Sequence, residues 1–350
     1  RTLGSGMMAG ITSPARPWFQ LNSSNRTLNE VTAVKEWLST VQGIMYDVYS
    51  ASNIYNQLHA TYNELGVFGT AAIGIFENFE NVIRGKNYTI GSYMLGMGAD
   101  DKVDTLYREY QLTVGQVVKE FGEKNVTADI LKQWQNGNTE NAIDIVYLVE
   151  PNDNRNTTSP LAKDKAFRSV YYVACNDKTD NAILRRSGFD EFPMLTPRWD
   201  VVGEETYSHD CPGMLALGDT KGLQLGEKRL YQALDKVGNP PLQGDSAMKN
   251  DVNGGVPNPG QTIWHSSNSK GLETVYGAYA PRIDMMQDVQ SRVEQRINTA
   301  FFVDLFLMLA NSDRRQITAR EVAEKHEEKL LMLGPVLERL HNELLDPLID

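Results

Sequence analysis

The chain has 350 residues, of which 41% are hydrophobic and 23% are charged, proportions that are ordinary for a globular protein of one large or two medium-sized domains. No stretch approaches the roughly 18 uninterrupted apolar residues of a membrane-spanning helix, and the most apolar run, 299–310, is interrupted by Asp304. The formal net charge of −11 argues against a protein that grips nucleic acid, because a gripping surface concentrates Lys and Arg.

The first part of the chain has mainly helical patterns. Residues 1–11 are helix-like until two prolines break the pattern, and 18–21 then alternate briefly as a short strand would. From 29 to 65 apolar residues recur every three or four positions, which predicts amphipathic helix with an interruption at 52–53. The small and β-branched residues of 69–76 predict a strand.

The middle of the chain, 76–205, has a mixed pattern. Short runs of β-branched and aromatic residues predict strands, and stretches with helical periodicity lie between them. The predicted strands are 88–90, 143–149 and 169–174, and the predicted helices are 113–122 and 127–136.

Two helices flank a loop-rich insert in the later part of the chain. The first follows Gly213 and ends at Gly238, and the second keeps helical spacing from Ile283 to Leu305. Between them, 239–262 is dense in Gly, Pro and Asn, which predicts a protruding loop or a small β module.

A polar break at 311–316 precedes the last helix. The break contains the basic pair Arg314 and Arg315, and a solvated turn or a loop presented to an anionic partner accounts for this pair equally well. Thr318 and Glu321 have the spacing of a capping box. We expect Pro335 to kink the helix that follows, because proline removes one backbone donor.

Enzyme signatures are absent from the sequence, and we expect no cofactor and no metal. The five histidines are far apart, and His326 does not stand in the H-E-x-x-H motif of zinc proteases. We interpret Cys175 and Cys211 as reduced structural thiols. A hydrolase built around His209, Cys211 and nearby carboxylates is the weaker alternative, since residues adjacent in a chain seldom face each other productively.

Three blocks of sequence resemble a known family. They are LGSGMMAGITSPARPWFQL at 3–21, ELGVFGTAA at 64–72 and ITAREVAEKHEEKLLMLGPVLERL at 317–340, continued by LLDPLI at 344–349. These blocks are similar to segments of the portal, or head-to-tail connector, proteins of short-tailed bacteriophages. The third is the most specific, because it combines a capping box, a proline and a regular apolar stripe. The middle of the chain matches only weakly.

The resemblance implies an α+β subunit of a ring, usually of twelve copies, at one vertex of a capsid. It assigns 1–208 to a wing of mixed α/β structure, 209–238 to a first stem helix, 239–272 to a clip, 273–310 to a second stem helix, 311–317 to a channel loop and 318–350 to a long post-channel helix. The family's amino-terminal extension and its crown are missing, and both ends look cut from a longer chain.

The resemblance also implies partners and contact residues. The packaging terminase and later the tail adaptors would dock on the clip, for which the candidates are Asn239, Pro240, Pro241, Val256, Pro257, Asn258, Pro259 and Trp264. The channel loop that faces the DNA would contain Asn311, Ser312, Asp313, Arg314, Arg315 and Gln316. Other implied partners are further copies of the chain, the major capsid protein and double-stranded DNA that passes without sequence specificity.

The negative charge fits this role, because a moving polyanion needs only weak attraction from an acidic ring with a few basic loop residues. The expected location is the virion, after synthesis in the cytoplasm of the bacterial host, with no membrane partner. Another virion or scaffold protein that forms no channel remains an alternative.

Overall fold

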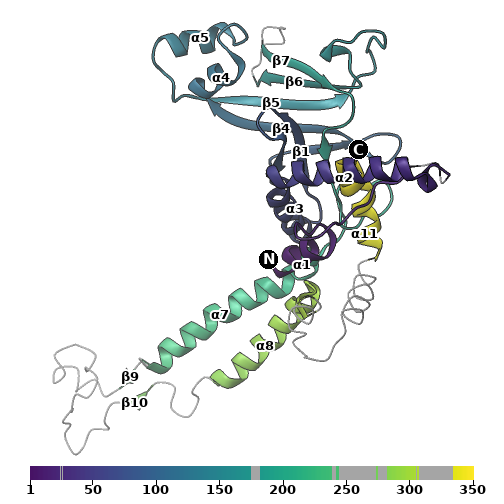
Figure 1. Cartoon of the computed structure of the whole chain (residues 1–350). Coiled ribbons are helices and arrows are strands. Elements are labelled where there is room, and N and C mark those ends of the chain that lie inside the picture. The colour runs from purple at the N-terminus through teal and green to yellow at the C-terminus, as the bar shows by residue number, and fades with distance from the viewer. Residues whose placement is uncertain are drawn as a thin grey trace, which may run out of the picture. The chain divides into compact units, whose positions relative to one another are not determined.

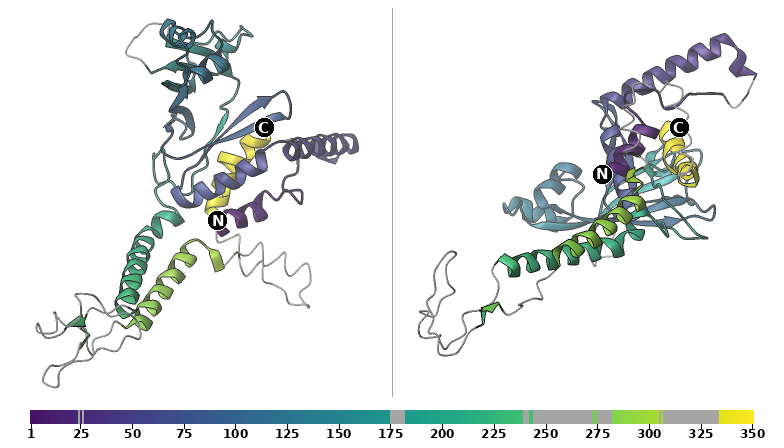
Figure 2. Two further views of the ribbon diagram at one scale, coloured as in Figure 1. Left: turned by 90° about the vertical axis from the view of Figure 1, so that its left-hand side faces the viewer. Right: turned by 90° about the horizontal axis from the view of Figure 1, so that it is seen from below.

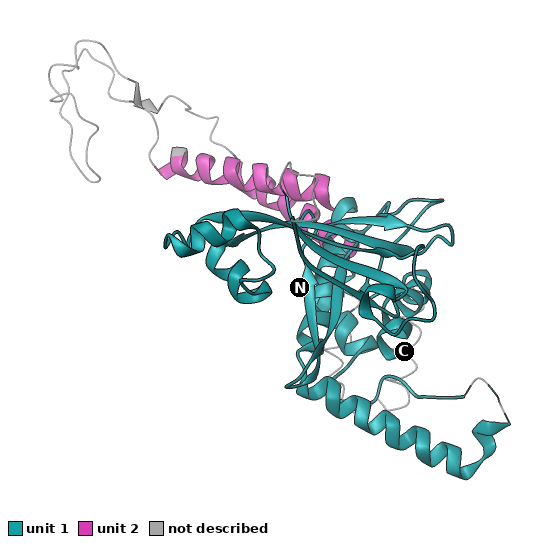
Figure 3. Cartoon of the chain, turned by 90° about the horizontal axis from the view of Figure 1, so that it is seen from above, with its two compact units in different colours: residues 1–215, 301–350 teal, residues 216–300 magenta. Residues whose placement is uncertain are grey.

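The structure is a computed structural model, and it describes residues 1–23, 25, 27–174, 182–238, 242–243, 273–274, 282–304, 306 and 334–350. These residues form two compact units, one of 1–215 with 301–350 and the other of 216–300 (Figure 3). The first unit contains helices and two sheets, and the second is mainly a pair of helices. This mixture confirms the predicted α+β class.

The first unit begins with a layer of helices. They are α1 (Thr2–Ile11), the short η1 (Leu28–Glu30), α2 (Thr32–Ala51) and α3 (Ile54–Phe68). Leu3 and Met7 of α1 and Leu58 and Leu65 of α3 are buried in one core, because residues four or seven positions apart lie on the same side of a helix. Helix α3 ends at Gly69, whose φ of 76° is the left-handed conformation that glycine adopts without strain.

Helix α2 is exposed along most of its length, and an irregular segment of chain lies beside it. The backbone N–H groups of Trp18 and Phe19 both donate to the Tyr46 hydroxyl, each at 2.9 Å, and that hydroxyl donates to the Phe19 carbonyl. The strand predicted at 18–21 is therefore wrong, because these backbone hydrogen bonds go to a tyrosine side chain and not to a neighbouring strand.

Eight strands of the first unit's described residues form two antiparallel sheets (Figure 1). They are β1 (Ala72–Asn78), β2 (Val82–Tyr88), β3 (Met94–Met97), β4 (Val103–Thr113), β5 (Ala142–Pro151), β6 (Phe167–Val173), β7 (Ile183–Phe189) and β8 (Met194–Leu195). The sheet orders are β2-β1-β8 and β3-β4-β5-β6-β7. The strands predicted at 143–149 and 169–174 are confirmed, whereas the strand predicted at 88–90 lies earlier, as β2.

Two short helices cover one end of the five-stranded sheet. They are α4 (Val114–Phe121) and α5 (Ala128–Gln135), as the sequence predicts. Helix α4 starts with a capping box, in which the Thr113 side chain accepts from the backbone of Gln116 and the Gln116 side chain accepts from that of Thr113. Val117, Phe121 and Ile130 are buried there against the sheet.

The end of the chain returns to the helical layer. It consists of α11 (Gly334–Leu340), the π-helical turn η6 (His341–Leu345) and α12 (Asp346–Ile349). Leu340, Leu344 and Leu348 are buried in the core shared with α1 and α3 (yellow and purple in Figure 2). The Tyr49 hydroxyl donates to the Leu348 carbonyl at 2.9 Å. Residues 318–333 lie outside the described residues, so the kink at Pro335 stays a prediction.

A buried ion pair ties this returning segment to the sheets. The guanidinium of Arg198, which is only 6% exposed, donates to Glu343 Oε1 from Nη2 at 2.6 Å and from Nε at 3.1 Å. Its backbone N–H donates to Glu343 Oε2 at 2.9 Å. The same guanidinium reaches the carbonyls of Glu205 and Asp101 at 3.1 and 3.3 Å. Arg198 therefore joins three separate stretches of chain.

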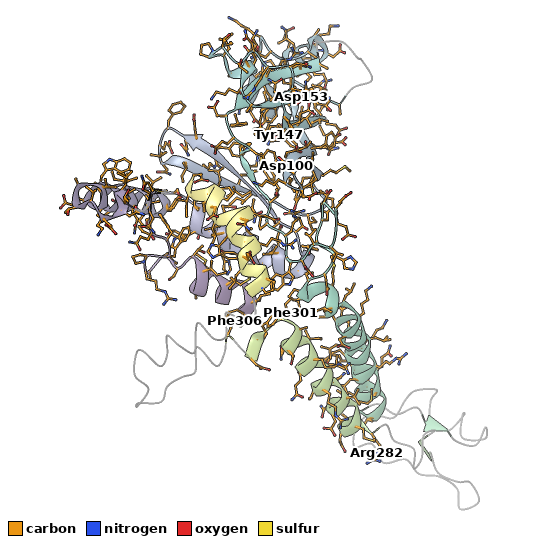
Figure 4. All side chains as sticks on the ribbon, turned by 90° about the vertical axis from the view of Figure 1, so that its right-hand side faces the viewer. Asp100, Tyr147, Asp153, Arg282, Phe301 and Phe306 are labelled. Carbon is orange, nitrogen blue, oxygen red and sulfur yellow. The ribbon has the colours of Figure 1, made fainter. Side chains whose placement is uncertain are left out.

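The helix expected over Ile283–Leu305 is shorter than predicted. Helix α8 ends at Ala300, and Phe302 has a φ of 54°, which no helix interior accommodates. Beyond this turn Phe306 packs against Gly6 of α1 (Figure 4). Residues 273–274 form the strand β10, so the stem helix assigned to 273–310 occupies only part of that range.

Candidate functional site: the paired helices α7 and α8

The second unit is built on two antiparallel helices, α7 (Leu217–Gly238) and α8 (Ile283–Ala300). Asp219 near the start of α7 contacts Arg296 near the end of α8, which fixes the opposite chain directions. The two helices run side by side in both views of Figure 2. At 1.5 Å per residue, the 22 residues of α7 make a rod about 33 Å long.

The contact between the two helices uses small residues and one buried amide. Leu230, Ala233 and Gln290 are buried, and a Cβ added at Gly226 would lie 3.4 Å from Gln290 Nε2. The Gln290 Nε2 atom is buried without a hydrogen-bond partner among the described residues. The pair is therefore held by close approach of the helices more than by a wide apolar seam.

One bidentate ion pair fixes the register of the helices. Arg296 donates to the two carboxylate oxygens of Asp219 at 3.0 and 2.6 Å. This hydrogen bonding and the negative charge of Asp219 raise the pKa of the Arg296 guanidinium. An exposed ion pair of this kind contributes little to stability. Its two parallel hydrogen bonds nevertheless restrict how the two helices are oriented at this contact.

Large apolar side chains remain exposed on both helices. Tyr231 is 68% exposed and Val289 is 58% exposed. The exposed set on α7 and α8 comprises Leu217, Leu225, Tyr231, Leu234, Val237, Met285 and Val289. These exposed side chains are available to pack against another protein chain.

Charge is distributed unevenly between the two units. Residues 216–300 contain nine Lys and Arg and nine Asp and Glu, so the second unit is formally neutral. The whole net charge of −11 is therefore carried by the first unit. The excess of acidic residues in the whole sequence therefore does not extend to the unit that contains the paired helices.

A second exposed apolar surface runs along α2. Val34, Trp37, Val41, Ile44 and Val48, here called the α2 seam, follow the alternating three- and four-residue spacing of a coiled-coil stripe. Trp37 is 64% exposed and Ile44 is 57% exposed. The helix carries only three charged residues, so its apolar seam has little charge around it.

The predicted contact residues lie outside the described residues. This holds for the clip candidates Asn239, Pro240, Pro241, Val256, Pro257, Asn258, Pro259 and Trp264, and for the channel-loop candidates 311–316. Within the insert, β9 (Leu242–Gln243) and β10 (Glu273–Thr274) pair antiparallel. This pairing is compatible with the small β module that the sequence suggests.

The candidate hydrolase residues are not arranged for catalysis. The Cys211 thiol is buried, it lies 3.3 Å from the Val67 carbonyl, and burial raises its pKa. Nδ1 of His209 lies 3.4 Å from Glu205 on an exposed surface. Among the described residues no group of three His, Cys, Asp or Glu side chains is placed to hold a metal ion. No helix in the same residues is long and apolar enough to cross a membrane.

Comparison with known proteins decides the family. The family described as bacteriophage head to tail connecting protein has a sequence model that matches residues 1–350. The chain belongs to this family. It is 44% identical over 350 residues to a portal protein of Salmonella phage epsilon15 and 42% identical over 350 residues to a probable portal protein of Bordetella phage BPP-1. Each match covers the whole chain and 62% of the relative, so the chain spans less than two thirds of either portal protein.

Membership of the head-to-tail connecting family agrees with the resemblance that the sequence suggests. Sequence reasoning nevertheless missed the α2 seam as an exposed surface, because an apolar stripe at helical spacing is usually buried core. It also missed Arg198 and Glu343, which are 145 residues apart in the chain and meet only in the folded unit. No local pattern around either residue signals that pairing.

Proposed function

We propose that this chain is the subunit of a phage portal, a closed ring at one capsid vertex through which DNA is packaged and ejected and which connects the capsid to the tail. The observation that carries the proposal is the family match over the whole chain, together with the portal names of relatives at 42–44% identity. The expected assembly is a homo-oligomer of twelve copies located in the virion. We propose no catalytic role for it.

The exposed helices support assembly with further copies. A ring needs two lateral surfaces on each subunit, one for each neighbour. The apolar side chains left exposed on α7 and α8 and those of the α2 seam supply surfaces that no other part of the described chain covers. Each subunit has a charge of −11, so copies are expected to repel one another. Because the second unit is neutral, contacts between second units of neighbouring copies add nothing to this repulsion.

The proposed parts of the subunit follow the chain. Residues 1–208 form the wing, 209–238 and the helical part of 273–310 form the stem, and 239–272 form the clip that meets the terminase and later the tail adaptors. Residues 311–317 form the channel loop, and 318–350 lead towards a crown. The major capsid protein contacts the ring from outside.

Removing the basic pair of the channel loop tests the DNA-conducting role. We expect Arg314→Ala/Arg315→Ala to reduce DNA packaging or retention severalfold while rings still form, because the pair supplies the weak attraction to the moving polyanion. Packaging assays and particle imaging of the same preparation measure both properties. The channel-loop assignment fails if the rings that the variant forms, however few, package and retain DNA normally.

A channel-free scaffold protein is the second candidate. The exposed apolar side chains of α2, α7 and α8 suit any helical assembly protein, so they do not by themselves require a pore. Particle images separate the two, since only a portal ring has an open centre.

A further inference from the structure

Three cations of the first unit lie over aromatic rings, and a fourth, Arg84, is an electrostatic neighbour of one of them, Lys86. Arg84 and Lys86 come from β2, Arg108 from β4 and Arg185 from β7, and these four are here called the cationic patch. Lys86 Nζ and the guanidinium carbon of Arg108 lie over the same ring, that of Tyr88, at 5.8 and 4.8 Å from its centre.

Further aromatic rings lie beside these cations on the five-stranded sheet. The guanidinium carbon of Arg108 also lies 4.4 Å from the centre of the Tyr110 ring, and that of Arg185 lies 4.5 Å from Tyr171. Tyr171 stacks in turn on Tyr147 of β5, at 4.2 Å between ring centres. Strands distant in the sequence thus place their cations on one continuous row of rings.

The rings hold Lys86 and Arg108 through their faces and not through hydrogen bonds to acids. Attraction to a ring face positions a guanidinium but accepts none of its in-plane N–H groups in the way that a carboxylate does. The Arg108 Nε atom is shielded from solvent and has no hydrogen-bond partner among the described residues. The rings therefore fix the positions of these cations, and Arg185 in addition hydrogen-bonds the Tyr171 side chain.

The positive charge of the patch is only partly balanced, by the nearby carboxylate of Glu120. None of the four side chains makes an ion pair with a described residue, although Asp and Glu outnumber Lys and Arg by 45 to 34 in the chain. Burial, followed by the positive charge of Arg108, lowers the pKa of Lys86, and Glu120 opposes this. Like charges held together in this way become more stable when an anion binds between them.

We propose that the cationic patch binds the phosphate backbone of double-stranded DNA without reading its sequence. The patch donors match phosphate oxygens, and duplex DNA carries a phosphate charge about every 1.7 Å along its axis. The rings of Tyr88 and Tyr147 are only 3% and 2% exposed, so they offer no platform on which unpaired bases could stack. The choice of DNA over other polyanions rests on the proposed function.

A variant of the patch and a matched control test this binding. Arg84→Gln/Lys86→Gln/Arg185→Gln removes three exposed charges and leaves Arg108 on its rings. Lys35→Gln/Lys102→Gln/Lys124→Gln removes three exposed charges elsewhere in the first unit. The probe is a 30-base-pair duplex of arbitrary sequence, and its affinity for the whole chain is measured at several salt concentrations, with inorganic phosphate and a polyglutamate peptide as competitors.

For the patch variant we expect a loss of at least about tenfold in affinity at low salt. The slope of log Kd against the logarithm of the salt concentration is expected to be lower by about three. The control is expected to stay within about twofold of the unaltered chain. Circular dichroism and thermal unfolding of both variants show whether folding is intact, and Arg185→Lys in place of Arg185→Gln is expected to restore part of the binding.

Three outcomes overturn the proposal. They are unchanged duplex binding by the patch variant, an equal loss in the control, and binding of polyglutamate but not of duplex at the patch, which would indicate an acidic protein partner. Ring formation by each variant is imaged in parallel. A chain that binds duplex through the patch but forms no ring would contradict the portal role and leave this inference standing.

Discussion

At the scale of single residues, the buried pair of Arg198 and Glu343 has the largest expected effect on stability. Glu343→Gln leaves the Arg198 charge in an almost fully buried position without its counter-ion. Breaking a buried pair on one side typically costs about 3 kcal/mol or more. We expect the first unit to unfold at clearly lower temperature or denaturant concentration, as followed by circular dichroism. Glu338→Gln, on the exposed side of α11, is the matched control, and equal midpoints for the two variants would contradict this account.

Tyr49 gives the first unit a stability that depends on pH. Burial, followed by the nearby Tyr55 and Tyr46, raises the pKa of Tyr49 from 10.0 to about 12. The folded chain thus holds this proton more tightly than the unfolded chain, so the contribution is complete below pH 10 and is lost as pH rises towards 12. Tyr49→Phe is expected to cost about 1 kcal/mol at pH 7, because the Leu348 carbonyl loses its donor, and to flatten the decline above pH 10. Unfolding midpoints from pH 7 to pH 11 measure both effects, and an unaltered slope would count against them.

At the scale of secondary-structure elements, the α2 seam is expected to mediate contact between copies. Trp37→Glu/Ile44→Glu places two charges on the exposed seam, so it should weaken assembly while leaving the isolated chain folded. Ser39→Glu/Ser50→Glu adds the same charge on the other side of the helix and is expected to assemble normally. Mass measurement in solution gives the oligomeric state. Normal assembly of the seam variant would show that α2 faces solvent in the ring.

Elements with a strong local signal were predictable from the sequence, and elements that depend on distant partners were not. The three-four periodicity located α2, α3 and α7, and the capping box at Thr113 marks the start of α4. The end of α8 could not be predicted, because the apolar period continues through Phe301 while the chain turns at Phe302 to reach α1. The segment 18–21 alternates like a strand, but its backbone groups form hydrogen bonds with the Tyr46 hydroxyl and not with another strand.

The candidate site also has parts that the sequence predicts and parts that it does not. The family and the two helices of the second unit could be inferred from short blocks of sequence, because those blocks are continuous in the chain. The cationic patch could not be inferred, since Arg84, Arg108 and Arg185 lie on strands separated by many residues and only sheet pairing brings them together. An overall charge of −11 also concealed a local excess of positive charge.

At the scale of the whole molecule, the proposed function requires that copies of the chain close into a ring whose centre is open. The neutral helix pair of each copy is the proposed stem of that ring. Electron microscopy of the purified protein, combined with native mass measurement, tests this most directly. We expect closed rings with a central hole, of about twelve copies as the family resemblance implies, because head-to-tail contacts form a ring when their rotation closes. Monomers only, or solid oligomers without a central opening, would contradict the portal assignment.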